Sequence, residues 1–336
     1  MTIGPAHYFI TGTAGFIGYH LAARLLRDGH KVTGFDGMTP YYDVSLKHRR
    51  HALLHEFTAF TAHEAMLEDE AALTLALDAA APDVVIHLAA QAGVRYSIEN
   101  PRAYVNANLV GTFNILEEAR QRRVGHLLLA STSSVYGANS ELPFSEHHTT
   151  AEPLTLYAAS KQATEGMAHS YSHLFGVPTT AFRFFTVYGP WGRPDMALFK
   201  FTEAALKGLP LDVYNNGEME RDFTYIDDLV EAITLLARLP PGLQSDGLAC
   251  QSSSAPFRTV NIGNNQPVKL LDFIAAIEAA TGRETRRNYM PMQPGDVPRT
   301  WADTSALLEL TGFVPNTPVS KGVSAFVDWY RAYYRV

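Results

Sequence analysis

A tyrosine and a lysine four residues apart, Tyr157 and Lys161, could together act as a base. In a helix, side chains with this spacing lie on the same face, one turn apart. A lysine ammonium near a phenol stabilises the phenolate, so the tyrosine can take a proton near neutral pH. The spacing alone has little specificity, because a solvated lysine beside a half-buried tyrosine gives the same pattern. The segments around the pair must decide between these readings.

Four hydroxyl side chains stand upstream of this pair, at Ser131, Thr132, Ser133 and Ser134. They follow the apolar segment 127–130, which is typical of a buried strand. Hydroxyl groups in this position can hydrogen-bond a substrate alcohol and share its proton with a tyrosinate. A Ser/Thr-rich turn at a strand end is the structural alternative.

A glycine-rich turn near the N-terminus could bind a dinucleotide. The apolar run 7–11 is followed by Gly12, Gly15 and Gly18, and then by the helical apolar spacing of 21–26. In such a loop, glycine lets the backbone approach a pyrophosphate, and the helix N-terminus offers free N–H groups. A glycine turn before an ordinary core helix remains the alternative, since the spacing is G-x-x-G-x-x-G rather than G-x-G-x-x-G.

Asp36 ends the next apolar segment, 31–35, and lies 18 residues beyond Gly18. A carboxylate near this spacing can accept a hydrogen bond from the 2′-hydroxyl of an adenosine ribose, and it would repel a 2′-phosphate. Gly37 and Met38 provide no arginine for such a phosphate. The sequence therefore favours NAD over NADP, with a strand-end turn residue as the alternative role of Asp36.

The segments that must position these residues alternate between strand and helix. The predicted strands are 58–61, 84–88, 127–130 and 177–182, and the predicted helices are 70–80 and 104–122. This alternation predicts an α/β fold with a doubly wound parallel sheet, in which ligands bind beyond the carboxyl ends of the strands. Because Gly12, Asp36, Ala89 and Ser131 all follow strand ends, we expect them to meet at one crevice.

The composition limits the class of protein. The 336 residues are 46% hydrophobic and 18% charged, which allows a sizeable core in one large or two modest domains. The net charge of −7 argues against nucleic-acid binding. The single cysteine, Cys250, cannot form an internal disulfide, and neither a signal peptide nor a membrane span is evident. We therefore expect a cytoplasmic protein that binds neither nucleic acid nor membrane.

Several segments resemble a known family. Residues 11–18, together with Tyr157 and Lys161, resemble the extended short-chain dehydrogenase/reductase superfamily. More narrowly, the chain resembles the UDP-glucuronate 4-epimerase family, and this match rests on the segments 41–47, 91–97, 183–197 and 221–228. The glycine loop is generic to the superfamily, whereas the segment 183–197 is highly specific. The resemblance runs from about residue 7 to the C-terminus.

This resemblance implies a Rossmann-type domain with tightly bound NAD, which takes a hydride from C4 of the sugar and returns it to the other face. It implies that Tyr157 takes the proton of the 4-hydroxyl with help from Thr132, and that Lys161 holds the nicotinamide ribose and lowers the pKa of the tyrosine. The residues that it places at the cofactor are Gly12, Gly15, Phe16, Ile17, Gly18, Asp36, Leu88, Ala89, Ala90, Gln91, Asn108, Ser131, Tyr157, Lys161 and Phe185.

The resemblance also implies a set of residues that contact UDP-glucuronate or UDP-galacturonate. Arg193, Arg221 and Asp296 are expected to grip UDP, because the donors of arginine match phosphate oxygens. Arg95 could pair with the carboxylate or a phosphate, or lie on the surface. Gln293 stands where some nucleotide-sugar epimerases have arginine, which leaves that phosphate contact open. The full set is Arg95, Thr132, Ser133, Ser134, Tyr157, Thr186, Arg193, Phe199, Val213, Tyr214, Arg221 and Asp296.

Two other activities are weighed against 4-epimerisation. The 4-keto intermediate is a β-keto acid that can lose carbon dioxide, so a UDP-glucuronate decarboxylase is the alternative enzyme. The hydroxyls of Thr132, Ser133, Ser134 and Thr186 are the groups expected to hold the carboxylate and prevent this loss. A sugar-nucleotide dehydratase is excluded, because Ser133 and Ser134 replace the acid pair that follows the catalytic threonine in those enzymes. A non-catalytic binding regulator would be expected to lack Tyr157 or Lys161.

The second half of the chain is less regular and richer in proline. We expect residues 1–185 and about 225–256 to form the NAD-binding domain, and residues 186–224 and about 257–336 to form the UDP-sugar-binding lobe. The predicted helices 104–122 and 157–175 could pack across the axis of a homodimer. No metal is expected, because histidine pairs such as His169 and His173 lack carboxylate or cysteine partners at diagnostic spacing.

Overall fold

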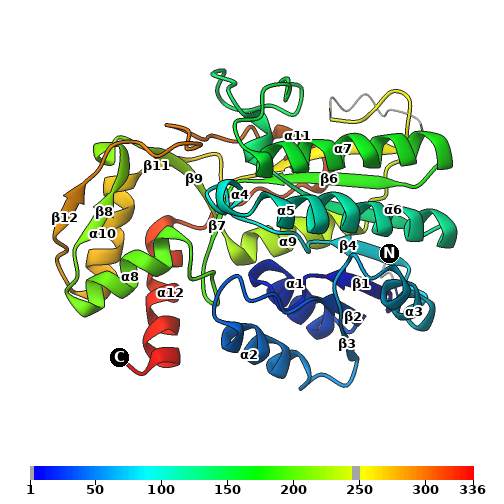
Figure 1. The fold of residues 1–336 in the computed structure, drawn as a ribbon, viewed down its shortest axis with the longest axis horizontal. Helices are drawn as coiled ribbons and strands as arrows, with labels where there is room; N and C mark the ends of the chain where they lie inside the picture. Colours follow the sequence, from blue (N-terminus) through cyan, green and yellow to red (C-terminus); the bar gives the residue numbers. More distant parts are fainter. Residues whose placement is uncertain (1–3, 244–249) are drawn as a thin grey trace.

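The computed structural model describes residues 4–243 and 250–336, and its centre is a seven-stranded parallel sheet (Figure 1). The strand order is β10-β6-β5-β4-β1-β2-β3, so the chain reverses its direction of winding between β1 and β4. The predicted doubly wound α/β fold is confirmed. The strands are β1 (His7–Thr11), β2 (Lys31–Asp36), β3 (Phe60–Glu64), β4 (Val84–His87), β5 (His126–Thr132), β6 (Thr179–Phe184) and β10 (Phe257–Ile262).

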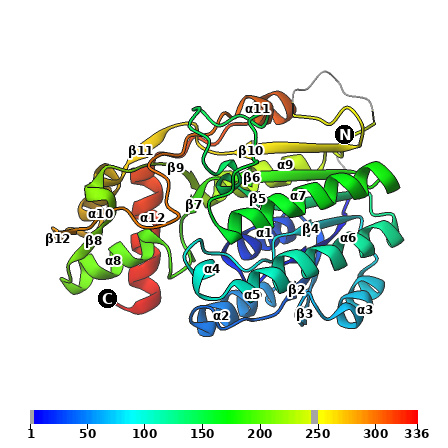
Figure 2. The same cartoon turned by 45° about the horizontal axis from the view of Figure 1, so that its top comes forward.

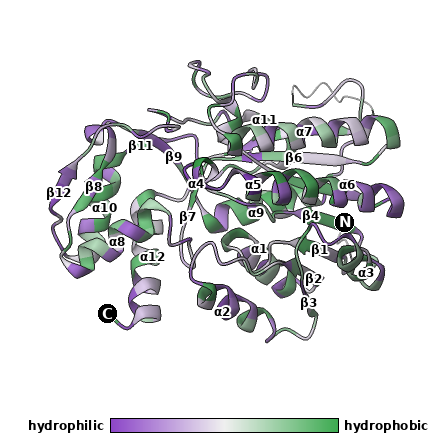
Figure 3. Ribbon diagram, in the orientation of Figure 1, coloured by the Kyte–Doolittle hydropathy of each residue, from purple (hydrophilic) through white to green (hydrophobic). Residues whose placement is uncertain are grey.

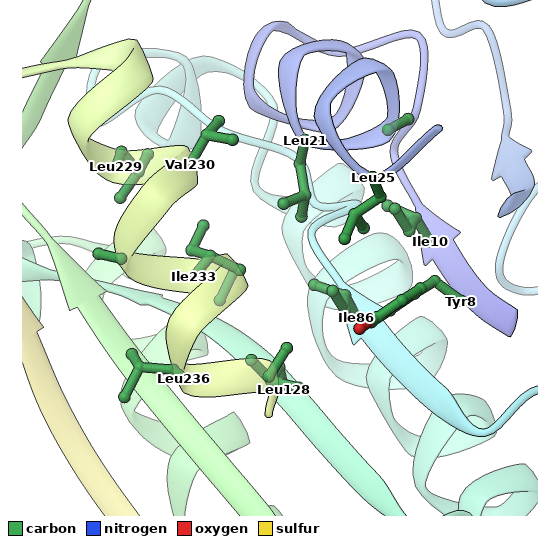
Figure 4. Packing of buried hydrophobic residues seen from close by; sticks show 14 of the residues in the cluster. Tyr8, Ile10, Leu21, Leu25, Ile86, Leu128, Leu229, Val230, Ile233 and Leu236 are labelled. Carbon is green, nitrogen blue, oxygen red and sulfur yellow. The ribbon is translucent and has the colours of Figure 1, made fainter. Parts of the chain in front are cut away.

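Helices cover both faces of this sheet because its strands carry apolar residues on both sides. One face packs against α1 (Phe16–Arg27), α2 (Val44–Leu54), α9 (Ile226–Ala237) and α11 (Ser305–Thr311). Figure 4 shows the centre of this packing, where Leu21 and Leu25 of α1 meet Ile233 of α9. The other face packs against α3 (Glu70–Ala80), α6 (Gly111–Arg122) and α7 (Leu156–Phe175). In Figure 2, α6 and α7 lie side by side over the sheet.

A second lobe lies beyond the carboxyl ends of the strands (Figure 1). It contains a three-stranded sheet of β11 (Pro267–Lys269), β9 (Glu220–Tyr225) and β7 (Thr186–Tyr188), and a strand pair of β8 (Leu211–Val213) and β12 (Arg287–Tyr289). Three helices pack on these strands: α8 (Ala197–Lys207), α10 (Leu270–Thr281) and α12 (Val319–Tyr334). Its core is aromatic, and the rings of Phe223 and Phe273 stack with centroids 4.1 Å apart. Figure 3 shows the contrast between the hydrophobic β4 and α9 and the hydrophilic ends of the outer helices.

The predicted boundary near residue 256 is wrong in one respect. β10 and α11, which we expected in the second lobe, belong to the first, because β10 pairs with β6 along its whole length and Leu307 of α11 is buried in the first core. The chain therefore crosses between the lobes several times. Residues 244–249, within the range 225–256 predicted for the NAD-binding domain, lie outside the described residues.

The helix predicted at 104–122 contains an irregularity that its periodicity does not reveal. Short α4 (Tyr96–Glu99) and α5 (Pro101–Tyr104) lead into a π-helical segment, η1 (Val105–Val110), before α6 begins. Two 3-10 turns complete the described elements, η2 (Ser133–Tyr136) and η3 (Tyr214–Gly217). Among the described residues, none of the helices combines the length and the apolar character that a bilayer span requires.

Buried histidines link the stability of the fold to pH. The ring of His126 on β5 contacts the Ala237 carbonyl oxygen through Nδ1 at 3.2 Å and Thr180 Oγ1 through Nε2 at 2.8 Å. Burial lowers the pKa of His126 to about 3, and the nearby charge of Arg258 acts in the same direction. The folded protein therefore keeps this ring neutral, whereas the unfolded chain takes up a proton near pH 6.5.

We predict that the unfolding free energy falls as the pH decreases from about 7 to 5, because the unfolded state then binds the proton that folded His126 excludes. The loss attributable to this one group is at most about 1.4 kcal/mol per pH unit. The variant His126→Gln keeps a donor for Ala237 and an acceptor for Thr180, so it should lose less stability than the wild type over this range. Urea unfolding at both pH values measures the difference, and equal losses in the two proteins would contradict the prediction.

Candidate active site

A cleft of about 1160 Å³ lies between the carboxyl ends of the sheet strands and the second lobe. Gly12, Asp36, Ala89 and Ser131 all line it, which confirms that the four predicted strand-end positions meet at one crevice. The second lobe contributes the opposite wall, including Arg193, Tyr214 and Arg221. Residues of both lobes therefore line the cleft. Its volume is large enough for a dinucleotide beside a second ligand.

The glycine turn brings three backbone segments into close contact. Gly12 has φ +83°, and a Cβ atom there would lie 2.9 Å from the nitrogen of Ala89 at the end of β4. A Cβ atom on Gly18 would lie 2.0 Å from the carbonyl oxygen of Gly12. A side chain at position 18 would therefore push α1 away from the end of β1, and a side chain at position 12 would push the end of β1 away from the loop after β4. The N-cap residue of α1 is Gly15, which has no side chain that could cap the helix. The N–H groups of the first turn therefore face the cleft.

Asp36 holds the turn from the other side. Its Oδ2 accepts a hydrogen bond from the nitrogen of Ala14 at 2.9 Å, and its Oδ1 accepts one from the nitrogen of Met38 at 2.9 Å. Lys47 also lines the cleft and donates to the carbonyl oxygen of Thr39 at 2.8 Å. Burial lowers the pKa of Lys47, while the Asp36 carboxylate acts in the opposite direction. The carboxylate is therefore placed at the cleft and rigidly oriented.

Tyr157 and Lys161 occupy the first turns of α7. Thr155 caps this helix, since its Oγ1 accepts a hydrogen bond from the nitrogen of Ala158 at 3.2 Å. Burial raises the pKa of the Tyr157 phenol, whereas a hydrogen bond with Thr132 and the charge of Arg193 lower it. The groups that favour the phenolate here include Thr132 and Arg193. Support of the phenolate by Lys161 stays a prediction.

The ammonium of Lys161 is directed toward the sheet. Its Nζ donates to the carbonyl oxygen of Ala130 on β5 at 2.9 Å. Burial lowers the pKa of Lys161 to about 8, and the carboxylate of Glu165, one turn along α7, acts in the opposite direction. Lys161 lines the cleft together with Tyr157, so both members of the predicted pair are brought to the site.

A buried ion pair supports the end of β5 from behind. The carboxylate of Glu165 accepts hydrogen bonds from Arg183 Nε at 2.9 Å and from Arg183 Nη2 at 2.7 Å. It also accepts the hydroxyl of Ser131 at 2.5 Å. The Ser131 hydroxyl therefore points into the protein, whereas Thr132, the next residue, turns its hydroxyl toward Tyr157. Because successive side chains of a strand point to opposite faces, Ser131 bonds the buried ion pair while Thr132 bonds the tyrosine.

Asn108 acts as a support rather than as part of the cleft wall. It lies in the π-helical segment and is fully buried. Its side chain accepts a hydrogen bond from the nitrogen of Gln91 at 2.8 Å and donates to Ser160 Oγ at 2.9 Å. Asn108 thereby ties the loop after β4 to α7. A π-helical turn often marks a functional site, but the sequence gives little signal for one.

Polar groups from both lobes gather near the tyrosine. The hydroxyl of Thr132 donates to Ser134 Oγ at 3.3 Å. The guanidinium of Arg193 donates to both carboxylate oxygens of Asp195, from Nε at 3.0 Å and from Nη2 at 2.5 Å. The hydroxyl of Tyr41 donates to the same carboxylate at 3.1 Å. Arg193 is therefore held in a fixed orientation at the Tyr157 end of the cleft.

A second group of polar side chains includes Arg95, Tyr214, Arg221 and Asp296. The guanidinium of Arg95 donates to Asp296 Oδ2 at 3.2 Å and lies over the ring of Tyr214, 4.7 Å from its centroid. Arg221 Nη1 donates to the carbonyl oxygens of Glu220 at 2.9 Å and Pro298 at 3.2 Å. Burial lowers the pKa of Arg221, and Asp296 acts in the opposite direction. Two arginines, an aromatic ring and a carboxylate suit a nucleotide.

Three of the predicted site residues do not line the cleft. Asn108 supports the loop after β4, Phe199 packs on α12 against Phe326, and Val213 is buried beside Ile274. The other predicted residues all line it. The site also contains residues that we did not single out, although Tyr41, Lys47 and Asp195 stand in the segments that carry the family resemblance. Tyr41, Lys47, Asp195, Lys200 and Thr300 are among them.

Within residues 4–243 and 250–336, no cluster of three or more His, Cys, Asp or Glu side chains is arranged to hold an ion.

Comparison with known proteins relates this chain to one protein family. The model of the NAD dependent epimerase/dehydratase family matches residues 8–247. A protein named probable UDP-glucuronate 4-epimerase, from Rhizobium meliloti (strain 1021), is 59% identical over 333 residues, which are 98% of this chain and 98% of that protein. UDP-glucuronate 4-epimerase 2 of Arabidopsis thaliana is 42% identical over 332 residues, which are 97% of this chain and 76% of that protein.

A solved structure shows the same fold with ligands. The UDP-glucuronic acid 4-epimerase from Bacillus cereus, in complex with UDP-glucuronic acid and NAD, superposes with a TM-score of 0.87 at 32% identity and covers 98% of this chain and 100% of that chain. The glycine turn, the Tyr157 and Lys161 pair and these matches agree, and the chain belongs to the NAD dependent epimerase/dehydratase family.

Proposed function

We propose that this protein is a UDP-glucuronate 4-epimerase, which interconverts UDP-glucuronate and UDP-galacturonate through a 4-keto intermediate with bound NAD. The observation that carries the proposal is the position of Tyr157. It lies in one cleft with a dinucleotide-type glycine turn, and its phenol bonds Thr132 near an arginine supplied by the other lobe. The relatives and the solved structure that match nearly the whole chain carry the same activity in their names.

The residues present fit NAD. The absence of side chains at Gly12, Gly15 and Gly18 lets a diphosphate approach the N–H groups at the start of α1. The Asp36 carboxylate at the cleft suits a ribose diol and disfavours a 2′-phosphate. When bound, NAD supplies the acceptor and donor of the hydride at C4. Lys161, at the floor of the same cleft, would hold the nicotinamide ribose.

The residues of this chain remove one proton from the sugar and later return it. Tyr157 as phenolate takes the proton of the 4-hydroxyl group and returns it after the sugar has turned. The hydroxyl of Thr132 is the proposed donor to the phenolate, and this bond would replace the one that it makes to Ser134 Oγ in the structure. Burial opposes the phenolate, so the charge of Arg193 and the Thr132 bond set how readily the tyrosine works as a base.

The carboxylate of the sugar must be held while C4 is a ketone. Loss of carbon dioxide from a β-keto acid needs the C–CO₂ bond aligned with the ketone, and hydrogen bonds that fix the carboxylate prevent this alignment. Thr132, Ser133, Ser134 and Thr186 line the cleft near the tyrosine and are the proposed donors. Arg193, held by Asp195 at this end, adds a positive charge that suits a carboxylate better than its originally expected place on UDP.

The nucleotide is proposed to bind at the second group of polar side chains described above. Arg221 and Arg95 are proposed to contact the diphosphate, Asp296 the ribose, and Tyr214 the uracil ring. In this arrangement the first lobe holds NAD and the second lobe holds most of the UDP-sugar.

A homodimer and a cytoplasmic location stay predictions. Support for a dimer comes from apolar side chains on η1, α6 and α7 that remain exposed, namely Val110, Phe113, Leu174 and Phe175. α6 and α7 pack against each other, so these helices could pair with their copies in a second chain.

Incubation of the purified protein with UDP-glucuronate, followed by NMR, tests the function. Interconversion with UDP-galacturonate is the expected result. A UDP-pentose with carbon dioxide would instead identify a decarboxylase, and the absence of turnover would favour a non-catalytic binding protein.

We predict that Tyr157→Phe lowers kcat by at least about 10²-fold, since general base catalysis contributes roughly 10²–10⁴-fold. The content of NAD and the affinity for UDP should stay close to those of the wild type, because the phenyl ring is retained. Tyr136→Phe is a matched control, since the Tyr136 hydroxyl is buried and donates to Asn261 Oδ1 at 2.7 Å. Tyr157→Phe with nearly full turnover would show that another group is the base.

We predict that Thr186→Ala increases the share of decarboxylated product, because one restraint on the carboxylate is lost. Carbon dioxide release and NMR of the UDP-pentose measure the partition between the two products. Thr202→Val is the control, since the Thr202 hydroxyl is buried in α8 and has no partner within the described residues. If the two variants partition identically to the wild type, Thr186 does not hold the carboxylate.

A further inference from the structure

Arg50, on α2, is a fully buried cation with an unusual set of partners. Its Nη1 donates to the carbonyl oxygen of Ala14 at 2.8 Å and to the hydroxyl of Tyr42 at 2.8 Å. Its Nη2 donates to the carbonyl oxygens of Trp191 at 2.5 Å and Gly192 at 3.4 Å. Within residues 4–243 and 250–336, no carboxylate bonds this guanidinium, and its Nε has no partner. Burying a charge in this way is costly, so an arginine here calls for an explanation.

Apart from Tyr42, the partners of Arg50 belong to two loops, the glycine turn and the turn before Arg193. Ala14 lies within the glycine turn, and its nitrogen is held by Asp36. Trp191 and Gly192 belong to a turn from the second lobe that leads directly into Arg193. Arg50 itself does not line the cleft. It therefore joins the cofactor turn to the segment that carries Arg193, through backbone atoms on both sides.

The turn that Arg50 holds is conformationally strained. Trp191 has φ +60° and Gly189 has φ +145°. A bulky residue with positive φ is uncommon and persists only where the surroundings impose it. The Trp191 ring packs against Tyr19 and Trp329, with centroids 5.6 and 5.3 Å away, while His20 contacts the Pro190 carbonyl oxygen at 2.9 Å. Arg50 is the charged residue among the side chains that hold this turn. Its planar guanidinium can donate hydrogen bonds to both loops at once.

We propose that Arg50 is a positioning residue for the epimerisation, which fixes the turn before Arg193 relative to the glycine turn. Arg193 thereby keeps a set distance from Tyr157 and from the cofactor side of the cleft. This inference rests on the proposed function. It also accounts for the retained charge, since a neutral side chain of similar length could not donate to carbonyl groups on both loops.

The test is a double-mutant cycle on kcat/KM with Arg50→Met and Arg193→Gln. Arg50→Met should lower kcat/KM roughly 100-fold, because small displacements of catalytic groups have effects of this order. In the Arg193→Gln background the same change should cost no more than about twofold, because the two residues act through one position. The Kd for UDP, measured by calorimetry, should stay within about twofold of the wild type, since UDP lies with Arg221 and Asp296.

Arg258→Met is the matched control. Arg258, the second residue of strand β10, is also buried. It donates from Nε to Thr180 Oγ1 at 3.0 Å and from Nη2 to the Leu239 carbonyl oxygen. Like Arg50, it makes no bond to a carboxylate among the described residues. Arg258→Met should lower the Tm but leave kcat/KM within about twofold of the wild type.

Additive losses in the cycle, or equal kcat/KM for Arg50→Met and Arg258→Met, would overturn the proposal. If Arg50→Met does not fold, Arg50→Lys replaces it in the same cycle. Lysine keeps the charge but not the fork, so the proposal requires a loss of kcat/KM that Arg193→Gln abolishes, and full activity of the lysine variant would contradict it. An inactive wild type in the same assay would instead mark a failure of the proposed function.

Discussion

The close approach of three backbone segments at Gly12, Gly18 and Ala89 is the constraint on which the rest of the structure depends. It lets α1 lie directly against β1 and lets the ends of β1 and β4 come together where the winding of the sheet reverses. A crevice is left beyond these strand ends, and the backbone of the glycine turn forms part of its wall. The loops after β2, β4 and β5 then meet at this crevice, although they are far apart in sequence.

The active site is built in layers around this crevice, and each layer has one task. The tyrosine and the threonine that bonds it face the cleft. Behind them the Glu165–Arg183 pair and Ser131 fix the end of β5, and Asn108 fixes the loop after β4. Polar groups that are buried and fully bonded to one another hold a site rigidly, because each lost bond leaves an unsatisfied partner. The side chains proposed to contact the sugar are thus positioned by groups that do not line the cleft or that point away from it.

Much of this arrangement could be predicted from the sequence, because the signals are local. The glycine spacing, Asp36 at a strand end, and the pair on α7 each follow from chain periodicity, and the convergence of strand ends follows from parallel topology. The second lobe could be predicted only in outline. β10 joins the sheet from a position beyond the second-lobe segments, and short apolar strands carry no signal for their partner. Phe199 and Val213 do not line the cleft, and the sequence does not reveal this, since an apolar residue beside a ligand and one in a core look alike in sequence.

The pairing of β6 with β10 has a consequence for how the chain is made. The two strands are partners in register, yet 78 residues separate Thr180 from Arg258. During synthesis, β6 is an open sheet edge until the ribosome has released most of the chain, because its partner comes after the first part of the second lobe. An exposed parallel edge can pair with another chain. The window in which the nascent protein is prone to aggregate is therefore set by the length of the segment inserted between these strands.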